Sequence, residues 1–217
     1  MPRPGRIRFL SRTAPFYDPV VHPLGFRRLW ESLAGWAAES AGTPCLDVCT
    51  GTGGVAVALA RRGSRVVGVD LASGMLRQAR RKARAAGVAD RAQWVRMDAR
   101  RIAFRDDSFP LVVCSMSFHE MAEEERGQVL EEIKRVASDR VVVADYRVPT
   151  AGWRRLLFPV FRAFEHLESE DFDGFTSVDF REALEEAGLV VEPPWDVALY
   201  RIWPCRVRRG PDEGVPS

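Results

Sequence analysis

The chain has 217 residues, of which 46% are hydrophobic and 29% charged, and its formal net charge is +2 at pH 7. These values are typical of a soluble globular protein with one domain, because the length is short for two independent cores. A charge this close to zero argues against a nucleic-acid partner. No apolar window approaches the length that spans a bilayer.

The four cysteines form no C-x-x-C pair, and three of them lie in apolar, strand-like runs where cysteine behaves as a small hydrophobe. Reduced thiols fit a cytosolic setting, and the basic N-terminus lacks the apolar core of a signal peptide. We therefore expect a cytoplasmic protein. His22, His119 and His166 form no metal-binding spacing with each other or with cysteine, so no metal is expected.

The predicted elements alternate between helix and strand. In chain order they are a helix near 24–41, a strand at 45–49, a helix at 54–62, a strand at 65–70, a helix at 72–87, strands at 91–98 and 110–116, a helix at 122–137 and a strand at 140–146. Strands of almost continuous Val, Leu and Cys, alternating with helices, are typical of a parallel sheet covered on both faces. The order predicts a doubly wound α/β fold.

The segment 151–175 falls outside this alternation and is aromatic and basic at its start. Its composition fits a lid over an apolar acceptor, or an amphipathic helix packed on the sheet. Residues 153–164 would also suit peripheral contact with a membrane surface.

A helix at 177–187 and two strands around 189–195 and 198–207 follow. Only a short loop separates these strands, so they are expected to pair antiparallel. We expect a single domain over 1–207 with a helical cover at about 16–42. The ends at 1–15 and 208–217 are rich in Arg, Pro and Gly and are expected to be poorly ordered, the second as a flexible tail.

The stretch "LDVCTGTGGVAVALA", residues 46–60, places a glycine turn between a strand and a helix. Gly51, Gly53 and Ala56 fit the G-x-G-x-x-A form of a dinucleotide site, and Asp70 follows at a suitable distance. The helix start offers unpaired N–H groups that could receive a pyrophosphate or the methionine carboxylate of S-adenosylmethionine. A tight turn without a ligand is the third interpretation.

Asp47, at the end of the strand before the turn, separates the two cofactors. A carboxylate facing a pyrophosphate would be repulsive, whereas a carboxylate near a methionine ammonium is attractive. Asp70 does not distinguish the two cofactors, because both contain ribose hydroxyls whose hydrogen bonds it could accept. The charge pattern favours S-adenosylmethionine.

Three stretches occur in a characteristic order: "LDVCTGTGG", "VVGVDLASGML" and "MDARRIAFRDDSFPLVVCSMSFHEM". With them, the chain resembles a class I S-adenosylmethionine-dependent methyltransferase over roughly residues 13–192. It resembles most closely the branch of ubiquinone/menaquinone biosynthesis C-methyltransferases. The resemblance implies a Rossmann-like fold with a seven-stranded, mostly parallel sheet, helices on both faces and a C-terminal antiparallel strand pair.

The resemblance also implies which residues hold the cofactor. Those at the methionine end would be Asp47, Cys49, Gly51, Gly53 and Ser115, with Cys49 standing where the general pattern has its first glycine. Asp70 would bind the ribose hydroxyls, Leu71 and Met75 would pack on the adenine, Asp98 would accept its exocyclic amine, and Ala99 would offer its backbone to the ring. Ala103 and Pro110 depart from the usual Pro and Asp, and both changes are conservative.

Methyl transfer from a sulfonium is an in-line displacement, so the protein mainly aligns the acceptor and excludes water. His119 lies just past a strand end, where it could take a proton from a phenol, hydroxyl or amine. It could instead pack beside the pocket or orient Glu120. Tyr17, which the resemblance places over the cofactor, could donate a hydrogen bond there or only fix the N-terminal helix on the sheet.

Three functions follow. The first is methyl transfer from S-adenosylmethionine, with S-adenosylhomocysteine as product, to a small-molecule or lipid-like acceptor, such as a quinone-type compound. The second is an NAD-dependent oxidoreductase that uses the same turn. The third is a methyltransferase-like protein that binds the cofactor without turnover.

Overall fold

One eight-stranded sheet organises the fold. The computed structural model describes residues 4–21, 25–37, 42–147, 175 and 179–208. Within these ranges the sheet order is β3-β2-β1-β4-β5-β8-β6, with β7 also paired to β8. The strands are β1 (Pro44–Val48), β2 (Arg65–Asp70), β3 (Ala92–Arg96), β4 (Phe109–Ser115), β5 (Ala137–Tyr146), β6 (Leu189–Val191), β7 (Trp195–Val197) and β8 (Tyr200–Val207).

Strands β1 to β5 are parallel, and β8 runs antiparallel to β5. β6 and β7 both pair antiparallel with β8, and their registers differ by one residue. They correspond to the first of the two final strands that the sequence predicts, the one around 189–195, which is interrupted around Pro193 and Pro194 because proline cannot donate to a ladder. The expected fold class and the C-terminal antiparallel pair are thus confirmed, and the one difference is this break.

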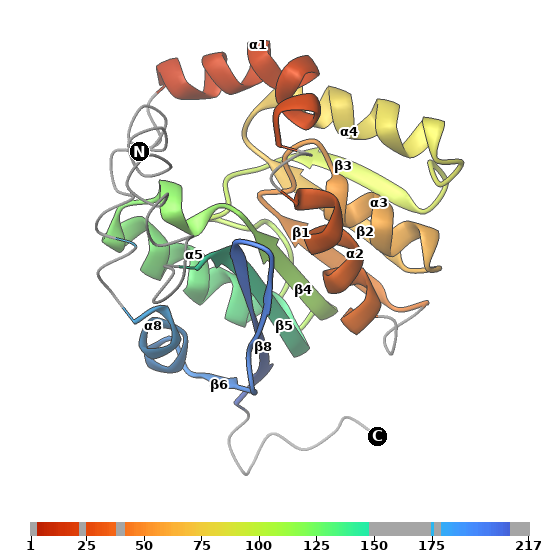
Figure 1. Cartoon of the computed structure of the whole chain (residues 1–217). Helices are drawn as coiled ribbons and strands as arrows, with labels where there is room; N and C mark the ends of the chain where they lie inside the picture. Colours follow the sequence, from red (N-terminus) through yellow and green to blue (C-terminus); the bar gives the residue numbers. More distant parts are fainter. Residues whose placement is uncertain (1–3, 22–24, 38–41, 148–174, 176–178, 209–217) are drawn as a thin grey trace.

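Helices cover both faces of the sheet (Figure 1). They are α1 (Pro4–Val21), α2 (Phe26–Trp36), α3 (Gly54–Arg61), α4 (Ser73–Ala85), α5 (Glu123–Val136) and α8 (Phe180–Glu186), with a short 3-10 turn η3 (Phe118–Glu120) after β4. Helices α2, α3 and α4 lie on one face, and α5 and α8 lie on the other. The central strands are therefore buried from both sides, which explains their continuous apolar sequences.

The N-terminal helix α1 begins earlier than predicted. The expectation of a poorly ordered end at 1–15 is wrong for the described part, because α1 runs from Pro4 despite two internal prolines. Its inner face packs on α4: Ala14 joins Ala72 and Met75 in a small buried cluster, flanked by Ile7 and Tyr17. This tertiary packing stabilises a segment whose composition alone predicts a loop.

Most of the segment 151–175, including the proposed membrane contact at 153–164, lies outside the described residues, as does the tail from 209 onward. Phe175 is the member of that segment that the structure places, and it is buried. None of the helices in the described ranges is long and apolar enough to cross a bilayer.

Candidate active site

The candidate site lies at the carboxyl edge of the parallel strands, where open α/β sheets bind their ligands. The turn after β1, the last residue of β2 and the loops after β3 and β4 all meet there, because these strands are parallel neighbours. The site residues predicted from the sequence lie on or next to these segments, except Tyr17 on α1 and Met75 on α4.

The glycine turn has an unusual backbone. Cys49, Gly51 and Gly53 all have positive φ angles, of 55°, 54° and 75°. A side chain at Gly51 would meet nothing within 4 Å, so this position opens onto free space. At Gly53 a Cβ would lie 2.6 Å from the Trp94 ring, so glycine is needed there for packing under the turn as well as for backbone freedom. The left-handed geometry at Cys49 explains why glycine is usual at this position.

Asp47 is the most deeply buried carboxylate of the turn, with 1% of its surface exposed. The Thr50 hydroxyl donates to its Oδ2 at 2.5 Å, while Oδ1 has no hydrogen-bond partner among the described residues. Burial raises the pKa of Asp47 to about 7, although the Thr50 hydroxyl and the nearby Ala56 N–H oppose this. A buried oxygen without a partner is costly, so this site favours an incoming donor or cation.

Asp70 closes β2 beside the turn. Its Oδ2 accepts the Gly51 N–H at 2.9 Å and its Oδ1 accepts the Ala72 N–H at 2.7 Å. Burial, with a smaller contribution from the charge of Glu120, raises the pKa of Asp70 to about 6, although the hydrogen bonds from the Ala72 and Gly51 N–H groups oppose this. Asp70 also raises the pKa of Asp47. The carboxylates of Asp47, Asp70 and Glu120 are thus close enough for Asp70 to interact with each of the other two. Their combined negative potential favours a cationic ligand over a pyrophosphate.

Asp98, the predicted acceptor of the adenine amine, is already paired. The Arg100 guanidinium donates to both of its oxygens, at 3.0 and 2.7 Å, and the Arg100 N–H donates to Oδ1 at 3.0 Å. Arg100 also reaches Glu125 on α5 at 2.9 Å. Arg100 holds the pKa of Asp98 below its usual value. Sequence reasoning missed this pair, although an arginine two residues after an aspartate is a visible signal.

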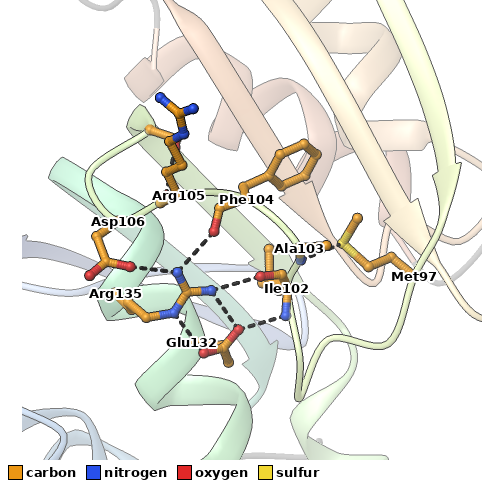
Figure 2. Close-up of polar contacts among 9 residues, drawn as sticks. Met97, Ile102, Ala103, Phe104, Arg105, Asp106, Glu132 and Arg135 are labelled. Carbon is orange, nitrogen blue, oxygen red and sulfur yellow. Dashed lines mark hydrogen bonds and ion pairs between the residues drawn. The ribbon is translucent and has the colours of Figure 1, made fainter.

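Helix α5 braces the loop between β3 and β4, as Figure 2 shows. Arg135 donates to the carbonyls of Ile102 and Phe104, at 2.7 and 2.9 Å, and to the carboxylates of Glu132 and Asp106. Glu132 in turn accepts the Ile102 N–H at 2.6 Å. The loop that carries Asp98 is thereby fixed to the helix by its backbone.

His119 and Asp145 form a buried pair at the ends of β4 and β5. Asp145 has no exposed surface, and its Oδ1 lies 2.7 Å from His119 Nδ1. The N–H groups of Ser117, Phe118 and His119 donate to its Oδ2 at 3.2, 2.9 and 3.3 Å. A carboxylate so placed only accepts, so Nδ1 donates to it, and the other ring nitrogen, Nε2, lies 3.9 Å from Glu120 Oε1.

Aromatic rings surround this pair. The His119 ring lies 4.7 Å from the Tyr146 ring and 6.4 Å from the Phe175 ring, both edge-on. Sequence reasoning missed Asp145, which lies inside the apolar run of β5. Its position at the carboxyl end of the strand next to β4 was the available signal.

Helix α1 closes over the glycine turn. Asp18 accepts the Thr52 hydroxyl at 2.7 Å and pairs with Lys82 Nζ at 2.6 Å, while Lys82 also donates to Thr52 and lies over the Trp30 ring. Tyr17 is half-buried beside this contact, with its ring edge-on to Phe26. The structure thus places Tyr17 beside the turn without distinguishing its two predicted roles.

The remaining predicted residues lie on the same rim. Leu71 is half-buried and its carbonyl accepts from Arg96, Met75 is buried under α1, Ala99 is buried after β3, and Ser115 is half-buried at the end of β4. The residues present fit S-adenosylmethionine, because the Asp47 oxygen that has no partner among the described residues lies beside an open glycine turn and near the Asp70 carboxylate. Asp47, Gly51 and Asp70 would hold its methionine and ribose parts.

This fold and site define a class of protein. A family model described as a methyltransferase domain matches residues 45–140. Together with the relatives below, this match shows that the chain belongs to the class I S-adenosylmethionine-dependent methyltransferases. The membership favours the methyltransferase prediction over the oxidoreductase alternative.

The chain is similar to quinone methyltransferases, as predicted. It is 32% identical to the ubiquinone/menaquinone biosynthesis C-methyltransferase of Paracoccus denitrificans over 178 residues, which cover 76% of this chain and 70% of that protein. It is 31% identical to the 2-phytyl-1,4-naphtoquinone methyltransferase of Trichormus variabilis over 147 residues, 64% of this chain. The chain spans 63% of the length of that second relative, a little under two thirds.

Among solved structures, the chain is similar to magnesium protoporphyrin IX methyltransferase from Synechocystis with bound S-adenosylhomocysteine. The TM-score is 0.67 at 17% identity, over 85% of this chain and 84% of that one. At this identity the likeness establishes the fold alone.

Proposed function

We propose that the protein transfers a methyl group from S-adenosylmethionine to a quinone-type acceptor in its reduced, hydroxyl-bearing form. The buried Asp47, with one oxygen lacking a partner beside the glycine turn, is the observation that carries the cofactor assignment. A methionine ammonium would supply the missing donor and compensate the buried charge. Asp70 would accept the ribose hydroxyls in exchange for its present N–H partners.

The acceptor assignment rests on the relatives and on the His119–Asp145 pair. Both relatives described above carry quinone biosynthesis or a phytyl naphthoquinone in their names. A hydroquinone is a weak acid, and a base held by a buried carboxylate is suited to take its hydroxyl proton. The buried rings of Tyr146 and Phe175 pack edge-on against His119, so the proposed base lies in the aromatic, apolar surroundings that suit such an acceptor.

In the proposed reaction, Nε2 of His119 accepts the hydroxyl proton while Asp145 holds Nδ1–H and stabilises the imidazolium that results. The electron pair released from the O–H bond moves through the ring, so that a ring carbon attacks the methyl. S-Adenosylmethionine supplies that methyl on a sulfonium, whose S–C bond breaks as the new C–C bond forms. The ring carbon would then lose its own proton to solvent, and the carbonyl oxygen would take back the proton held on Nε2, so that the ring is aromatic again and His119 returns to its starting state.

Calorimetry tests the cofactor. We expect saturable binding of S-adenosylmethionine and S-adenosylhomocysteine, no binding of NAD, and a loss of about tenfold or more in affinity for Asp70→Ala, since this carboxylate makes charge-assisted hydrogen bonds. Thermal shifts with the same three ligands give an independent reading. Stronger stabilisation by NAD than by S-adenosylhomocysteine would overturn the assignment.

Turnover is tested with a prenylated 1,4-naphthoquinol, and the oxidised quinone serves as the control because it has no hydroxyl proton to lose. We expect methylation of the quinol alone. His119→Asn should lower kcat by about 100-fold or more, the usual contribution of a positioned base, with little change in S-adenosylhomocysteine affinity. Asp145→Asn should lower kcat and displace the acid limb of its pH profile.

Tight cofactor binding without methylation of any quinol would instead favour the prediction of a binding protein without turnover. An unchanged kcat in His119→Asn would show that His119 is not the catalytic base, and the cofactor assignment would still stand.

A further inference from the structure

Helix α1 is apolar on two opposite faces. Ile7, Ala14 and Tyr17 face the small cluster on α4, whereas Phe9 and Phe16 are 55% and 71% exposed. Each of these phenylalanines follows an inner residue by two positions, which is about 200° around a helix, and the two lie about two turns apart on one stripe. Single exposed apolar residues are common, but two large rings aligned on one helix face mark a contact surface.

The surroundings of this face are basic. Arg8 and Arg12 are exposed on α1 itself. Helix α4, which packs against α1, contains no acidic residue, and its exposed side chains include Arg77, Arg80, Arg81 and Arg84. In Figure 1 both helices lie at the same upper rim of the molecule.

The acidic charge lies elsewhere. Asp18, the acidic residue of α1, is engaged with Lys82 and Thr52. Helix α5, on the opposite face of the sheet, begins with Glu123, Glu124 and Glu125. Although the net charge of the chain is only +2, its charge is unevenly distributed, and the two packed helices α1 and α4 carry exposed arginines and one acidic side chain, Asp18.

We propose that the outer face of α1, together with the neighbouring arginines of α4, docks on an anionic lipid bilayer. Phe9 and Phe16 would enter the interface between headgroups and acyl chains, and the arginines would attract the anionic headgroups. Helix α1 contacts the glycine turn through the Asp18–Thr52 hydrogen bond, so docking would bring the rim of the active site to the membrane in which a lipid-like acceptor is dissolved. Only this benefit of docking rests on the proposed function.

Vesicle co-sedimentation of the full chain tests the surface. We expect binding to phosphatidylcholine vesicles that contain phosphatidylglycerol, weak binding to phosphatidylcholine alone, and weakening with added salt, because the headgroup attraction is screened. Equal binding to both kinds of vesicle, or to neither, would overturn the proposal.

Variants locate the contact. Phe9→Ser with Phe16→Ser should lower the partition coefficient by about tenfold or more, since two aromatic side chains lose their insertion. Arg8→Gln with Arg12→Gln should lower it by about fivefold per arginine and flatten its salt dependence. The matched control is Val190→Ser, because Val190 is 43% exposed on β6, away from α1, and its loss should leave binding unchanged.

Two further measurements, the cofactor affinity and the thermal midpoint, distinguish a failure of this proposal from a failure of the methyltransferase assignment. The double phenylalanine variant should retain the S-adenosylhomocysteine affinity and the thermal midpoint of the parent, so a loss of vesicle binding cannot be attributed to the cofactor site or to unfolding. Sedimentation equilibrium tests whether a second copy of the chain, rather than a lipid bilayer, covers this face. A dimer that the double variant converts to a monomer would overturn lipid docking in favour of a second copy of the chain.

Discussion

At the scale of single residues, Asp47 links cofactor binding to pH. Its pKa of about 7 in the fold lies above the ordinary 3.8, so between these values the folded protein holds a proton that the unfolded chain releases. This contribution to stability is fully present below pH 3.8 and is lost as the pH rises through about 7. At 1.36 kcal/mol per pKa unit, the free energy of unfolding changes by about 4 kcal/mol over this pH range.

We therefore expect Asp47→Asn, which never ionises, to be more stable than the parent at about pH 8, and this advantage to shrink as the pH falls and to vanish below pH 3.8. Urea unfolding without cofactor measures the difference at each pH. The same variant should bind S-adenosylhomocysteine more weakly. Parallel stability profiles for parent and variant would contradict the assignment of the raised pKa to this residue.

Substitutions at Cys49 test the left-handed backbone conformation of the turn. Its φ of 55° is left-handed, which costs a residue with a side chain about 1–2 kcal/mol relative to glycine. We expect Cys49→Gly to be more stable than Cys49→Ala by about 1 kcal/mol, the reverse of the order found in regular helices. Denaturant unfolding decides this, and an alanine variant as stable as the glycine variant would show that the turn relaxes.

The predicted cofactor residues occupy the rim of one site because their motifs depend on local spacing: a strand end, a turn and a helix start. Asp145 was missed because its role depends on the pairing of β4 with β5, which brings it to His119 across 26 positions of sequence. The pairing of Asp98 with Arg100 was missed because the motif defines the acid alone and leaves the two positions after Ala99 variable.

At the scale of elements, α5 holds the loop that carries Asp98. Arg135→Met removes hydrogen bonds to two backbone carbonyls and two carboxylates, so we expect a loss of about 2 kcal/mol in unfolding free energy. The affinity for S-adenosylhomocysteine should also fall several-fold. Urea unfolding and calorimetry measure the two effects. The control is Arg181→Met, whose exposed ion pair with Glu185 on α8 should contribute little.

Helix α1 depends on the Lys82 contact in a similar way. Lys82→Met keeps an apolar stem near Trp30 but leaves Asp18 without its cation, so α1 should detach more readily from the turn. Limited trypsin digestion followed by mass spectrometry should show faster cleavage after Arg8 and Arg12. Arg84→Met, an exposed change on the same helix, is the control, and equal cleavage rates in both variants would contradict the prediction.

The sheet was predictable and the N-terminal helix was not. The central strands are buried on both faces, so their apolar runs stand out in the sequence, and a two-residue loop forces β7 and β8 to pair antiparallel. Helix α1 contains Pro15 and Pro19, and its stability comes from packing on α4 rather than from helix propensity. A contact of that kind leaves no periodic signal in a short, proline-rich segment.

At the scale of the whole molecule, stability should decline from the middle of the sheet outward. β5 is paired on both sides, and its residues from Arg140 to Tyr146 are buried. Native-state hydrogen exchange should show its amides among the slowest and those of α1 among the fastest, because α1 lacks two internal N–H groups at its prolines. Added S-adenosylhomocysteine should slow exchange in α1, and protection of α1 equal to that of β5 would contradict this order.

The break around Pro193 and Pro194 has a consequence for the molecule in a crowded solution. β6 and β7 form one outer edge of the sheet, where a regular strand would offer a row of backbone groups to any passing extended chain. Two adjacent residues without N–H groups and a one-residue register change interrupt that row. The prolines that divide this edge into β6 and β7 therefore also protect the protein from forming fibrous assemblies through it.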